Sequence, residues 1–313
     1  MIYTYTLNPA LDCITWAPTL QEGGLSRAYR QEILPGGKGV NVAAVLTGLG
    51  HLCEARGFAA GFTGDALLAG LTAQGIRHDF QRLSEGQTRV NMKLKTGRMD
   101  APTETEINGP GPCPGEEDLE KLFVRMSFLK PDDWVILSGS LPPGVQPSLY
   151  SRMVRAANAK GARCVVDASG RALHWALPAH PWLVKPNRAE LAELVGEPMD
   201  TLEELHRGAE WVRSRTGGHV LVSLGGEGAV LLTAGGEFWH QPPTPGTVVN
   251  TVGAGDSMVA GFVAMSLAPR SRLHTALMYS AACGAATAFT EGLADHRGIV
   301  AAARLTPPPQ RLA

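Results

Sequence analysis

The sequence lacks an excess of charge of either sign, paired cysteines and any long apolar run. A formal net charge of −1 gives no support for binding to nucleic acid, so we expect a small partner held by a few placed cations. The five cysteines are odd in number and scattered without metal-ligand spacing, which favours a reducing compartment. No apolar run approaches the ~20 residues that span a bilayer, and the start has no basic leader. The sequence therefore predicts a soluble, cytoplasmic protein with no nucleic-acid or membrane partner.

Apolar residues are abundant enough for one large core. They make up 44% of 313 residues, which favours a single domain over 1–313. Short β-rich runs alternate with helical patterns: strands are expected near 134–137, 164–167, 182–184 and 220–223, with helices near 147–160 and 188–195. Such βαβ alternation predicts an α/β fold with a mainly parallel sheet and ligands at the carboxyl ends of its strands.

Two regions, 11–34 and 88–107, break this alternation. Residues 88–95 alternate with period two, and 103–107 can return as their hairpin partner. Strands of this kind form a small separate sheet with one polar face. We expect that sheet to be a lid over the ligand edge of the main sheet.

The most informative segment is Thr251-Val252-Gly253-Ala254-Gly255-Asp256-Ser257. The apolar run 258–265 that follows predicts a buried helix, whose free N–H groups and positive dipole end converge near the glycines. This arrangement is typical of a phosphate cradle with Asp256 as a base beside it. The alternative is that Asp256 only caps the helix.

A second glycine-rich segment, Pro35-Gly36-Gly37-Lys38-Gly39-Val40-Asn41, precedes another helical pattern. It is neither a Walker A loop nor GxGxxG. Gly36 and Gly37 permit close backbone approach, while Lys38 and Asn41 offer donors for sugar hydroxyls or a phosphate. The alternative is a turn with a solvated lysine.

Other strand ends carry polar groups of the same kind. Asp12 follows the first strand and can accept hydrogen bonds from two sugar hydroxyls, or form an Asx turn. The segment 138–144 can present amides and the Ser138 hydroxyl, or be a plain loop. Segment 223–228 is either a third glycine-rich site or a turn.

Segment 185–190 lies between an expected strand and an expected helix. Asn187 and Glu190 share one face of the first turn, where they could hold hydrated Mg²⁺ near nucleotide phosphates, with Lys185 adding charge. A capping box explains the same pair equally well.

Taken in order, NPALD, PGGKGVN, SGSLPPG, VKPNRAEL, SLGGEG and TVGAGDS resemble the ribokinase-like (phosphofructokinase B) family along nearly the whole chain. The chain is most similar to the hexose-phosphate branch of that family. The resemblance implies a three-layer α/β/α core with a small β-sheet lid that often clasps a homodimer. It also implies transfer of the ATP γ-phosphoryl group to a sugar phosphate, with Mg²⁺.

By motif position, the resemblance implies a role for each site residue. Asp256 would be the base and Gly253, Ala254 and Gly255 the anion hole. The sugar contacts would be Asp12, Gly36, Gly37, Lys38, Asn41 and Ser138, and the acceptor's phosphate would meet Arg27, Arg89 and Lys93. The nucleotide would meet Lys185, Asn187, Ser223, Gly225, Gly228 and Thr251, and Mg²⁺ would meet Asn187 and Glu190.

The lid departs from the family pattern, because some sugar-phosphate kinases carry a lysine where this chain has the segment 22–27. Fructose 1-phosphate, giving fructose 1,6-bisphosphate, is the expected acceptor, with tagatose 6-phosphate and fructose 6-phosphate left open. Two other classes also remain: a dinucleotide oxidoreductase, disfavoured by the missing GxGxxG, and a non-catalytic sugar-phosphate sensor, disfavoured by Asp256 and its glycines.

Overall fold

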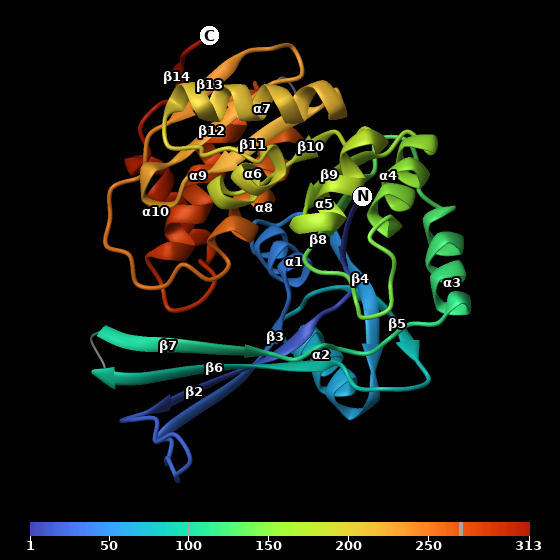
Figure 1. Ribbon diagram of the computed structural model, residues 1–313, viewed down its shortest axis with the longest axis vertical. Helices are drawn as coiled ribbons and strands as arrows, with labels where there is room; N and C mark the ends of the chain where they lie inside the picture. Colours follow the sequence, from blue (N-terminus) through green and yellow to red (C-terminus); the bar gives the residue numbers. More distant parts are fainter. Residues whose placement is uncertain (99–100, 269–271) are drawn as a thin grey trace.

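A computed structural model describes residues 1–98, 101–268 and 272–313, and its fold is organised around a ten-stranded sheet (Figure 1). The strands lie in the order β14 (Gln310–Arg311), β13 (Phe238–Gln241), β12 (Ala229–Leu232), β11 (His219–Ser223), β10 (Leu183–Val184), β9 (Arg163–Asp167), β8 (Trp134–Ser138), β1 (Ile2–Thr6), β4 (Cys53–Ala60) and β5 (His78–Leu83). From β11 to β5 all neighbours are parallel, whereas β12 to β14 pair antiparallel. The expected mainly parallel sheet is confirmed.

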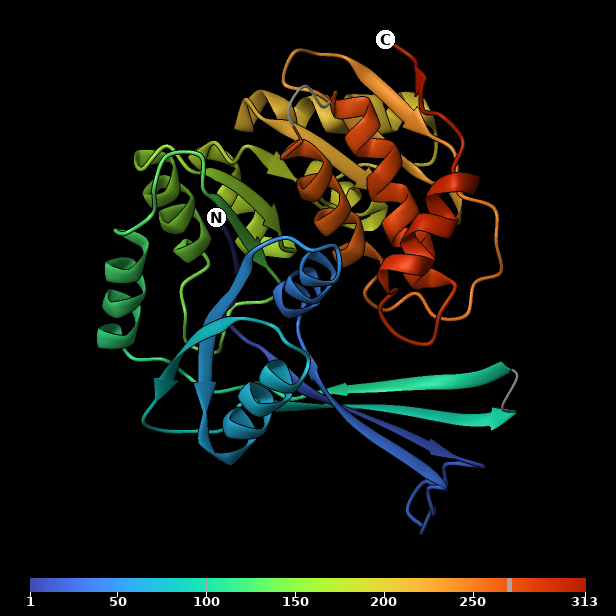
Figure 2. The same ribbon diagram turned by 180° about the vertical axis from the view of Figure 1, so that it is seen from behind.

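Helices cover both faces of this sheet, which gives three layers (Figures 1 and 2). One face packs against α3 (Glu116–Met126), α4 (Leu149–Ala159), α5 (Gly170–Ala176), α6 (Arg188–Val195) and α7 (Leu202–Thr216). The other packs against α1 (Lys38–Gly48), α2 (Gly61–Ala73), α8 (Ala254–Ser266), α9 (Leu273–Ala288) and α10 (His296–Leu305). Short 3₁₀ turns, η1 (Leu177–Ala179) and η2 (Gly225–Glu227), link some of these elements.

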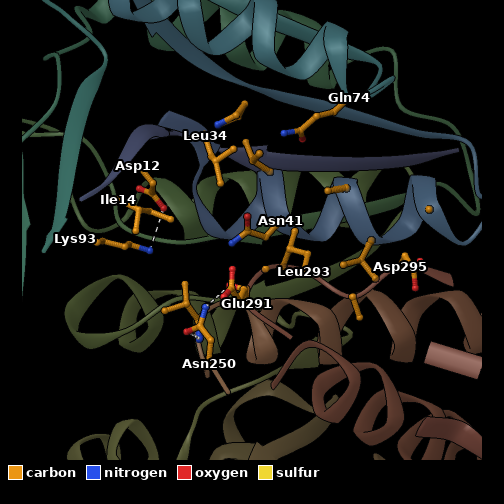
Figure 3. Close-up of a pocket in the computed structure, with 18 of the residues that line it drawn as sticks. Asp12, Ile14, Leu34, Asn41, Gln74, Lys93, Asn250, Glu291, Leu293 and Asp295 are labelled. Carbon is orange, nitrogen blue, oxygen red and sulfur yellow. Dashed lines mark hydrogen bonds and ion pairs between the residues drawn. The ribbon is translucent and has the colours of Figure 1, made fainter. Parts of the chain in front are cut away.

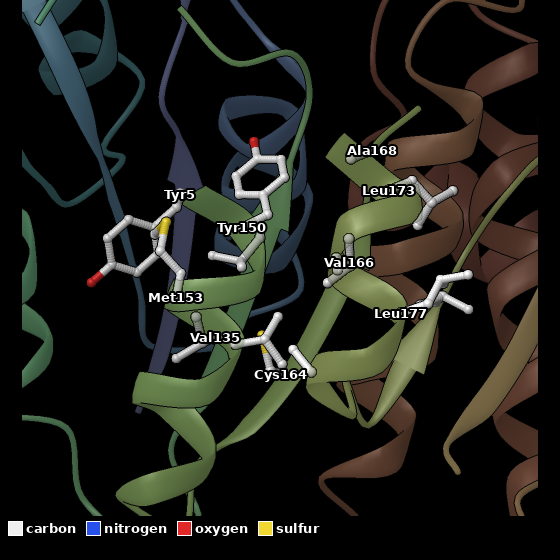
Figure 4. Packing of buried hydrophobic residues seen from close by; sticks show 14 of the residues in the cluster. Tyr5, Val135, Tyr150, Met153, Cys164, Val166, Ala168, Leu173 and Leu177 are labelled. Carbon is white, nitrogen blue, oxygen red and sulfur yellow. The ribbon is translucent and has the colours of Figure 1, made fainter. Parts of the chain in front are cut away.

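Strand β8 is apolar from Trp134 to Leu137 because both of its faces are buried. In β8, Val135 and Leu137 join the cluster on the α4 face, while Trp134 and Ile136 join the opposite cluster. Figure 4 shows the first cluster, with Val135, Val166 and Leu173 among its labelled members. This double burial explains why strand-length apolar runs, not alternation, marked the parallel strands in the sequence.

A second sheet of four strands lies beneath the carboxyl ends of the central strands (Figure 1). Its order is β3 (Arg30–Gly36), β2 (Ala10–Ala17), β6 (Arg89–Arg98) and β7 (Ala101–Asn108). β6 and β7 pair antiparallel, as the period-two pattern predicted. We call these four strands the second sheet.

The second sheet has two unlike faces, because paired residues in adjacent strands point the same way. Asp12 pairs with Asn91, and Asn91 with Asn108, on a polar face toward the main domain. Cys13 pairs with both Ile33 and Met92 on the outer face. That outer face carries exposed Ile33, Val90, Met92 and Ile107.

None of the helices in the described ranges is both long and apolar enough to cross a bilayer.

Candidate functional site

A glycine-rich turn sets the N-terminus of α8 at the centre of the molecule. Gly253 has φ +80° and is the N-cap, so α8 begins at Ala254. A Cβ on Gly253 would lie 2.6 Å from Leu293 Cδ2, so this position requires glycine for both its backbone and its packing. Gly255 is close to Lys185, whose Nζ would lie 3.3 Å from an added Cβ. The Ala254 N–H donates to the Thr251 carbonyl at 3.2 Å, and the turn presents the remaining N–H groups of the first helical turn, with the positive end of the helix dipole, to the cleft described below.

Asp256 lies at the third position of α8, so it is not the helix N-cap. Its side chain is 6% exposed and accepts a hydrogen bond from Asn41 Nδ2 at 2.8 Å. Burial, helped by the nearby Asp167 carboxylate, raises the pKa of Asp256 to about 6. A carboxylate with that pKa is still ionised at neutral pH yet basic enough to accept a proton.

Asp167, at the end of β9, is the acidic centre of a buried charge cluster. Its Oδ1 lies 3.0 Å from Lys38 Nζ and 3.3 Å from Lys185 Nζ. Burial alone would lower the pKa of Lys38, but Asp167, Glu190 and Asp256 outweigh it and raise that pKa. Lys38 therefore stays cationic beside the cradle.

Asp167 is not among the site residues expected from the sequence. The available signal was its place as a carboxylate directly after the apolar run 164–166.

The polar face of the second sheet supplies a second group of side chains. Asp12 lies within β2, not in an Asx turn, and it meets Lys93 Nζ at 3.1 Å and Asn91 Nδ2 at 3.0 Å. Gly36 lies against this carboxylate, since a Cβ there would be 2.6 Å from Asp12 Cγ. Arg89 donates to the Asn8 carbonyl at 3.1 Å, and burial lowers the pKa of Arg89 although Asp12 opposes the shift.

These groups surround a polar cleft of about 480 Å³. Of the residues expected from the sequence, it is lined by Asp12, Gly37, Lys38, Asn41, Arg89, Lys93, Lys185, Asn187, Glu190, Ser223, Gly253, Gly255 and Asp256. Sequence reasoning missed three further polar lining residues, Asn91, Glu106 and Asn108. Their period-two spacing showed that they share a face, but not that this face turns toward the cleft.

Arg27 and Ser138, both expected on the acceptor side, are not brought to the cleft. Arg27 is exposed in the loop between β2 and β3 and does not line it. The Ser138 side chain is fully buried, and its Oγ has no hydrogen-bond partner in the part of the chain that the structure describes.

Asn187 and Glu190 form the capping box of α6. Asn187 Oδ1 accepts from the Glu190 N–H, and Glu190 Oε2 accepts from the Asn187 N–H, both at 2.8 Å. The pair therefore caps α6, as the alternative interpretation predicted. The other oxygen of Glu190, Oε1, lies 4.0 Å from Lys38 Nζ, so the carboxylate also reaches the cleft.

These oxygens suit Mg²⁺, although no group of three or more acidic, His or Cys side chains in the described ranges could form a metal cage. Mg²⁺ keeps several waters and is commonly held by one or two carboxylates together with substrate phosphates. A single carboxylate edge such as Glu190 Oε1 beside the cradle fits that mode of binding.

A second cavity of about 430 Å³ meets the cleft at the cradle. Asn187, Ser223 and Gly255 line both spaces. The second cavity is otherwise formed by residues expected for the nucleotide and by an apolar wall: Gly225, Gly228, Thr251, Ala254, Met258, Ala285, Ala288 and Phe289. The flat apolar ring of a nucleotide could enter this cavity while the phosphates of the same nucleotide reach the α8 N-terminus.

Comparison with known proteins is consistent across the chain. A family model described as pfkB family carbohydrate kinase matches residues 8–297. The 1-phosphofructokinase of Bacillus subtilis (strain 168) is 38% identical over 293 residues, which are 94% of this chain and 94% of the relative. The 1-phosphofructokinase of Escherichia coli (strain K12) is 34% identical, with 96% and 95% covered.

Solved structures agree with this likeness. Phosphofructokinase-2 from Escherichia coli in complex with fructose-6-phosphate is 30% identical with a TM-score of 0.89, covering 97% of this chain and 98% of that one. Arabidopsis thaliana ribokinase complexed with ribose and ATP has a TM-score of 0.79 at 21% identity, covering 97% and 99%, and supports the fold alone.

Proposed function

Because the chain belongs to the pfkB family of carbohydrate kinases, we propose that it phosphorylates fructose 1-phosphate with ATP to give fructose 1,6-bisphosphate. The observation that carries the proposal is the meeting of a polar cleft and an apolar cavity at the α8 N-terminus, with Asp256 on the cleft side. The cleft suits a sugar phosphate and the cavity suits a nucleoside.

Asp256 is the general base in this proposal. The acceptor's 6-hydroxyl oxygen attacks the γ-phosphorus, the bond to the β,γ-bridging oxygen breaks, and the hydroxyl proton passes to the Asp256 carboxylate. The hydrogen bond from Asn41 holds that carboxylate in one orientation. The N–H groups of Gly253, Ala254 and Gly255 form an anion hole for charge on the transferred phosphoryl group.

Cationic side chains complete the phosphoryl site. Lys38 and Lys185 both form ion pairs with Asp167, and they offset the negative charge of the phosphates. Glu190 and Asn187 would hold Mg²⁺, which would supply positive charge against the negative charge that develops on the phosphates. Ser223, Gly225, Gly228 and Thr251 line the nucleotide side of the site.

The second sheet serves as the acceptor side and as a lid. The Asp12 carboxylate accepts hydrogen bonds from the sugar hydroxyls, and Gly36, Gly37 and Lys38 lie close by. Arg89 and Lys93 bind the phosphate that the acceptor already carries. Lys93 is paired with Asp12 in this structure, so it is already held beside the acceptor. A sheet in this position excludes water, which limits wasteful ATP hydrolysis.

The name of the relatives favours fructose 1-phosphate over the other acceptors. Tagatose 6-phosphate and fructose 6-phosphate are the alternatives, and phosphofructokinase-2 from Escherichia coli has been solved in complex with fructose-6-phosphate. A non-catalytic sensor remains the remote alternative, and a buried carboxylate with raised pKa at the cradle counts against it.

The test is kcat/KM for the three hexose phosphates in a coupled assay of ADP release. We expect fructose 1-phosphate to give the highest value. The control is Asp256→Asn, which should bind ATP but lose most turnover. A preference for a 6-phosphate acceptor would contradict the substrate assignment, and ATP binding without turnover on any acceptor would favour the sensor.

We also propose a homodimer formed through the second sheet. Its outer face exposes Ile33, Val90, Met92 and Ile107 in one patch, and a patch of this kind commonly marks an interaction surface.

A further inference from the structure

A third cavity, of about 590 Å³, lies between the second sheet and the loop that joins α9 to α10 (Figure 3). We call residues 289–295 the α9–α10 loop. Ile14 and Leu34 line the cavity from the sheet, and Glu291 and Leu293 line it from the loop. Asp12, Asn41 and Lys93 line both this cavity and the polar cleft, so the two spaces are neighbours.

Arg30, the first residue of β3, reaches the α9–α10 loop from the second sheet. Its guanidinium lies 4.1 Å from the centroid of the Trp16 ring, and its Nε lies 3.0 Å from Glu32 Oε1. These two contacts orient the side chain, and its Nη2 lies 3.5 Å from Glu291 Oε2 on the opposite side. The Arg30–Glu291 pair therefore joins the second sheet directly to the α9–α10 loop.

The α9–α10 loop is in turn fixed to the cradle. The Glu291 carbonyl accepts from Asn250 Nδ2 at 2.8 Å, and Asn250 Oδ1 accepts from the Val252 N–H at 3.1 Å. Figure 3 shows Asn250 and Glu291 side by side. Leu293 packs on Gly253, so a displacement of this loop would move the cradle from two directions.

A further pair of bonds ties the loop beside Asp256. The Ala294 N–H donates to Thr287 Oγ1 at 3.1 Å, and that hydroxyl lies 2.8 Å from Ser257 Oγ. Ser257 adjoins Asp256 in α8. A continuous chain of contacts thus runs from Arg30 in the second sheet to the N-terminus of α8.

We propose that Arg30 and Glu291 are positioning residues that form a latch, which couples the position of the second sheet to the shape of the Gly253–Gly255 cradle. When the sheet sits over the cleft, the latch holds the α9–α10 loop, and through Asn250 and Leu293 the loop holds the cradle. When the sheet lifts, that support is lost. The coupling itself is independent of the reaction, while its effect on turnover rests on the proposed kinase function.

The pair is weak enough to open in each cycle. The side chains of Arg30 and Glu291 are 44% and 75% exposed, and an ion pair so exposed changes an equilibrium by about two- to five-fold at most. It is also screened, because the Debye length falls to about 3 Å in 1 M salt. An ion pair of this strength favours the position of the second sheet over the cleft but does not prevent the sheet from moving away.

The first test needs no substrate. Hydrogen exchange is compared for the native protein, Glu291→Gln and the matched control Glu32→Gln. Loss of the latch should raise exchange about two- to five-fold both in β3 and at the Asn250 and Val252 amides, which are hydrogen-bonded in this structure. Glu32→Gln removes a contact that orients Arg30 but keeps the carboxylate of Glu291, so it should change exchange at the Asn250 and Val252 amides by less than Glu291→Gln does. Unchanged exchange at those two amides in Glu291→Gln would overturn the latch.

The second test is a double-mutant cycle on turnover with Arg30→Gln and Glu291→Gln. Each single variant should raise the KM for the sugar phosphate and lower kcat about two- to five-fold, and the double variant should lose no more than the worse single one. Multiplicative losses would overturn the coupling. If the native protein turned over no hexose phosphate, the kinase proposal would fail while the exchange result still decided the latch.

Discussion

Asp256 combines burial with the proposed role of general base, and both can be tested through its titration. Its pKa is raised to about 6 by burial and by Asp167, and it must be ionised to accept the acceptor's proton. We predict that kcat/KM is flat above pH 7 and falls about tenfold per unit below pH 6. Rate against pH, measured at fixed Mg²⁺, checks this. An acid limb centred near pH 4 would mean that the essential carboxylate is not this buried one.

The matched variant Asp256→Asn keeps the volume of the side chain but cannot accept the proton. Because positioned base catalysis contributes about 10²–10⁴-fold, we expect a loss of that size in kcat with little change in the KM for ATP. The residual rate should have no acid limb. Near-normal kcat in this variant would remove Asp256 from the mechanism.

The buried carboxylate of Asp256 should also lower the free energy of unfolding. A carboxyl group whose pKa is raised in the folded state binds protons more tightly when folded than when unfolded. It therefore lowers the free energy of unfolding fully above pH ~6, and this penalty disappears below the unfolded value of 3.8. We predict that Asp256→Asn raises the free energy of unfolding by about 1–3 kcal/mol at pH 7.5. Denaturant unfolding at pH 7.5 and pH 4 checks it, and a gain that does not shrink at pH 4 would contradict the ionisation argument.

At the scale of elements, the N-terminus of α8 depends on one glycine. Gly253 has φ +80°, and an added Cβ would meet Leu293 Cδ2 at 2.6 Å. Gly253→Ala should cost about 1–2 kcal/mol in backbone strain. By moving the donors of the proposed anion hole, it should also lower kcat on the order of 10²-fold.

Gly292→Ala is the matched control for that change. It lies next to Leu293, its φ is not in the left-handed region, and an added Cβ meets nothing within 4 Å. Its kcat and its thermal midpoint should stay close to native values. Equal losses in the two variants would show that the neighbourhood, and not the φ angle of Gly253, is sensitive.

The elements also explain how far the sequence could predict the site. Parallel strands end at one edge of a sheet, so polar motifs after several strands had to converge, and thirteen expected residues line one cleft. Asp167 was not predicted as a site residue because it is a single carboxylate after an apolar strand, with no glycine-rich or proline-containing motif around it. The spacing of Asn187 and Glu190 fits both a helix cap and a site in the cleft, so it cannot distinguish the two. In the structure the pair caps α6 and also lines the cleft.

Loops limited the prediction in another way. Arg27 lies in a loop whose path depends on no periodic pattern, and the structure leaves it exposed and away from the cleft. Asn91 and Asn108 were readable as one face of a hairpin, but the direction of that face is set by how the second sheet packs on the main domain. Tertiary packing, not local pattern, decides such cases.

For the whole molecule, the open question is what covers the outer face of the second sheet. Ile33, Val90, Met92 and Ile107 are 40–64% exposed there, and water contact with a patch of large apolar side chains is unfavourable. We predict a homodimer in which two such faces pack together. Its mass should be twice 33.1 kDa, as measured by light scattering or sedimentation.

Met92→Glu tests this, because in the dimer it would bury a carboxylate at the centre of the apolar patch. An unpaired buried charge costs several kcal/mol, so the variant should sediment as a monomer at concentrations where the native protein is dimeric. The control is Phe128→Glu, since Phe128 is 75% exposed on the main domain and its substitution should leave the mass unchanged. Should Met92→Glu retain the native mass while folding normally, the two outer faces do not meet, and any dimer would have to form through another surface.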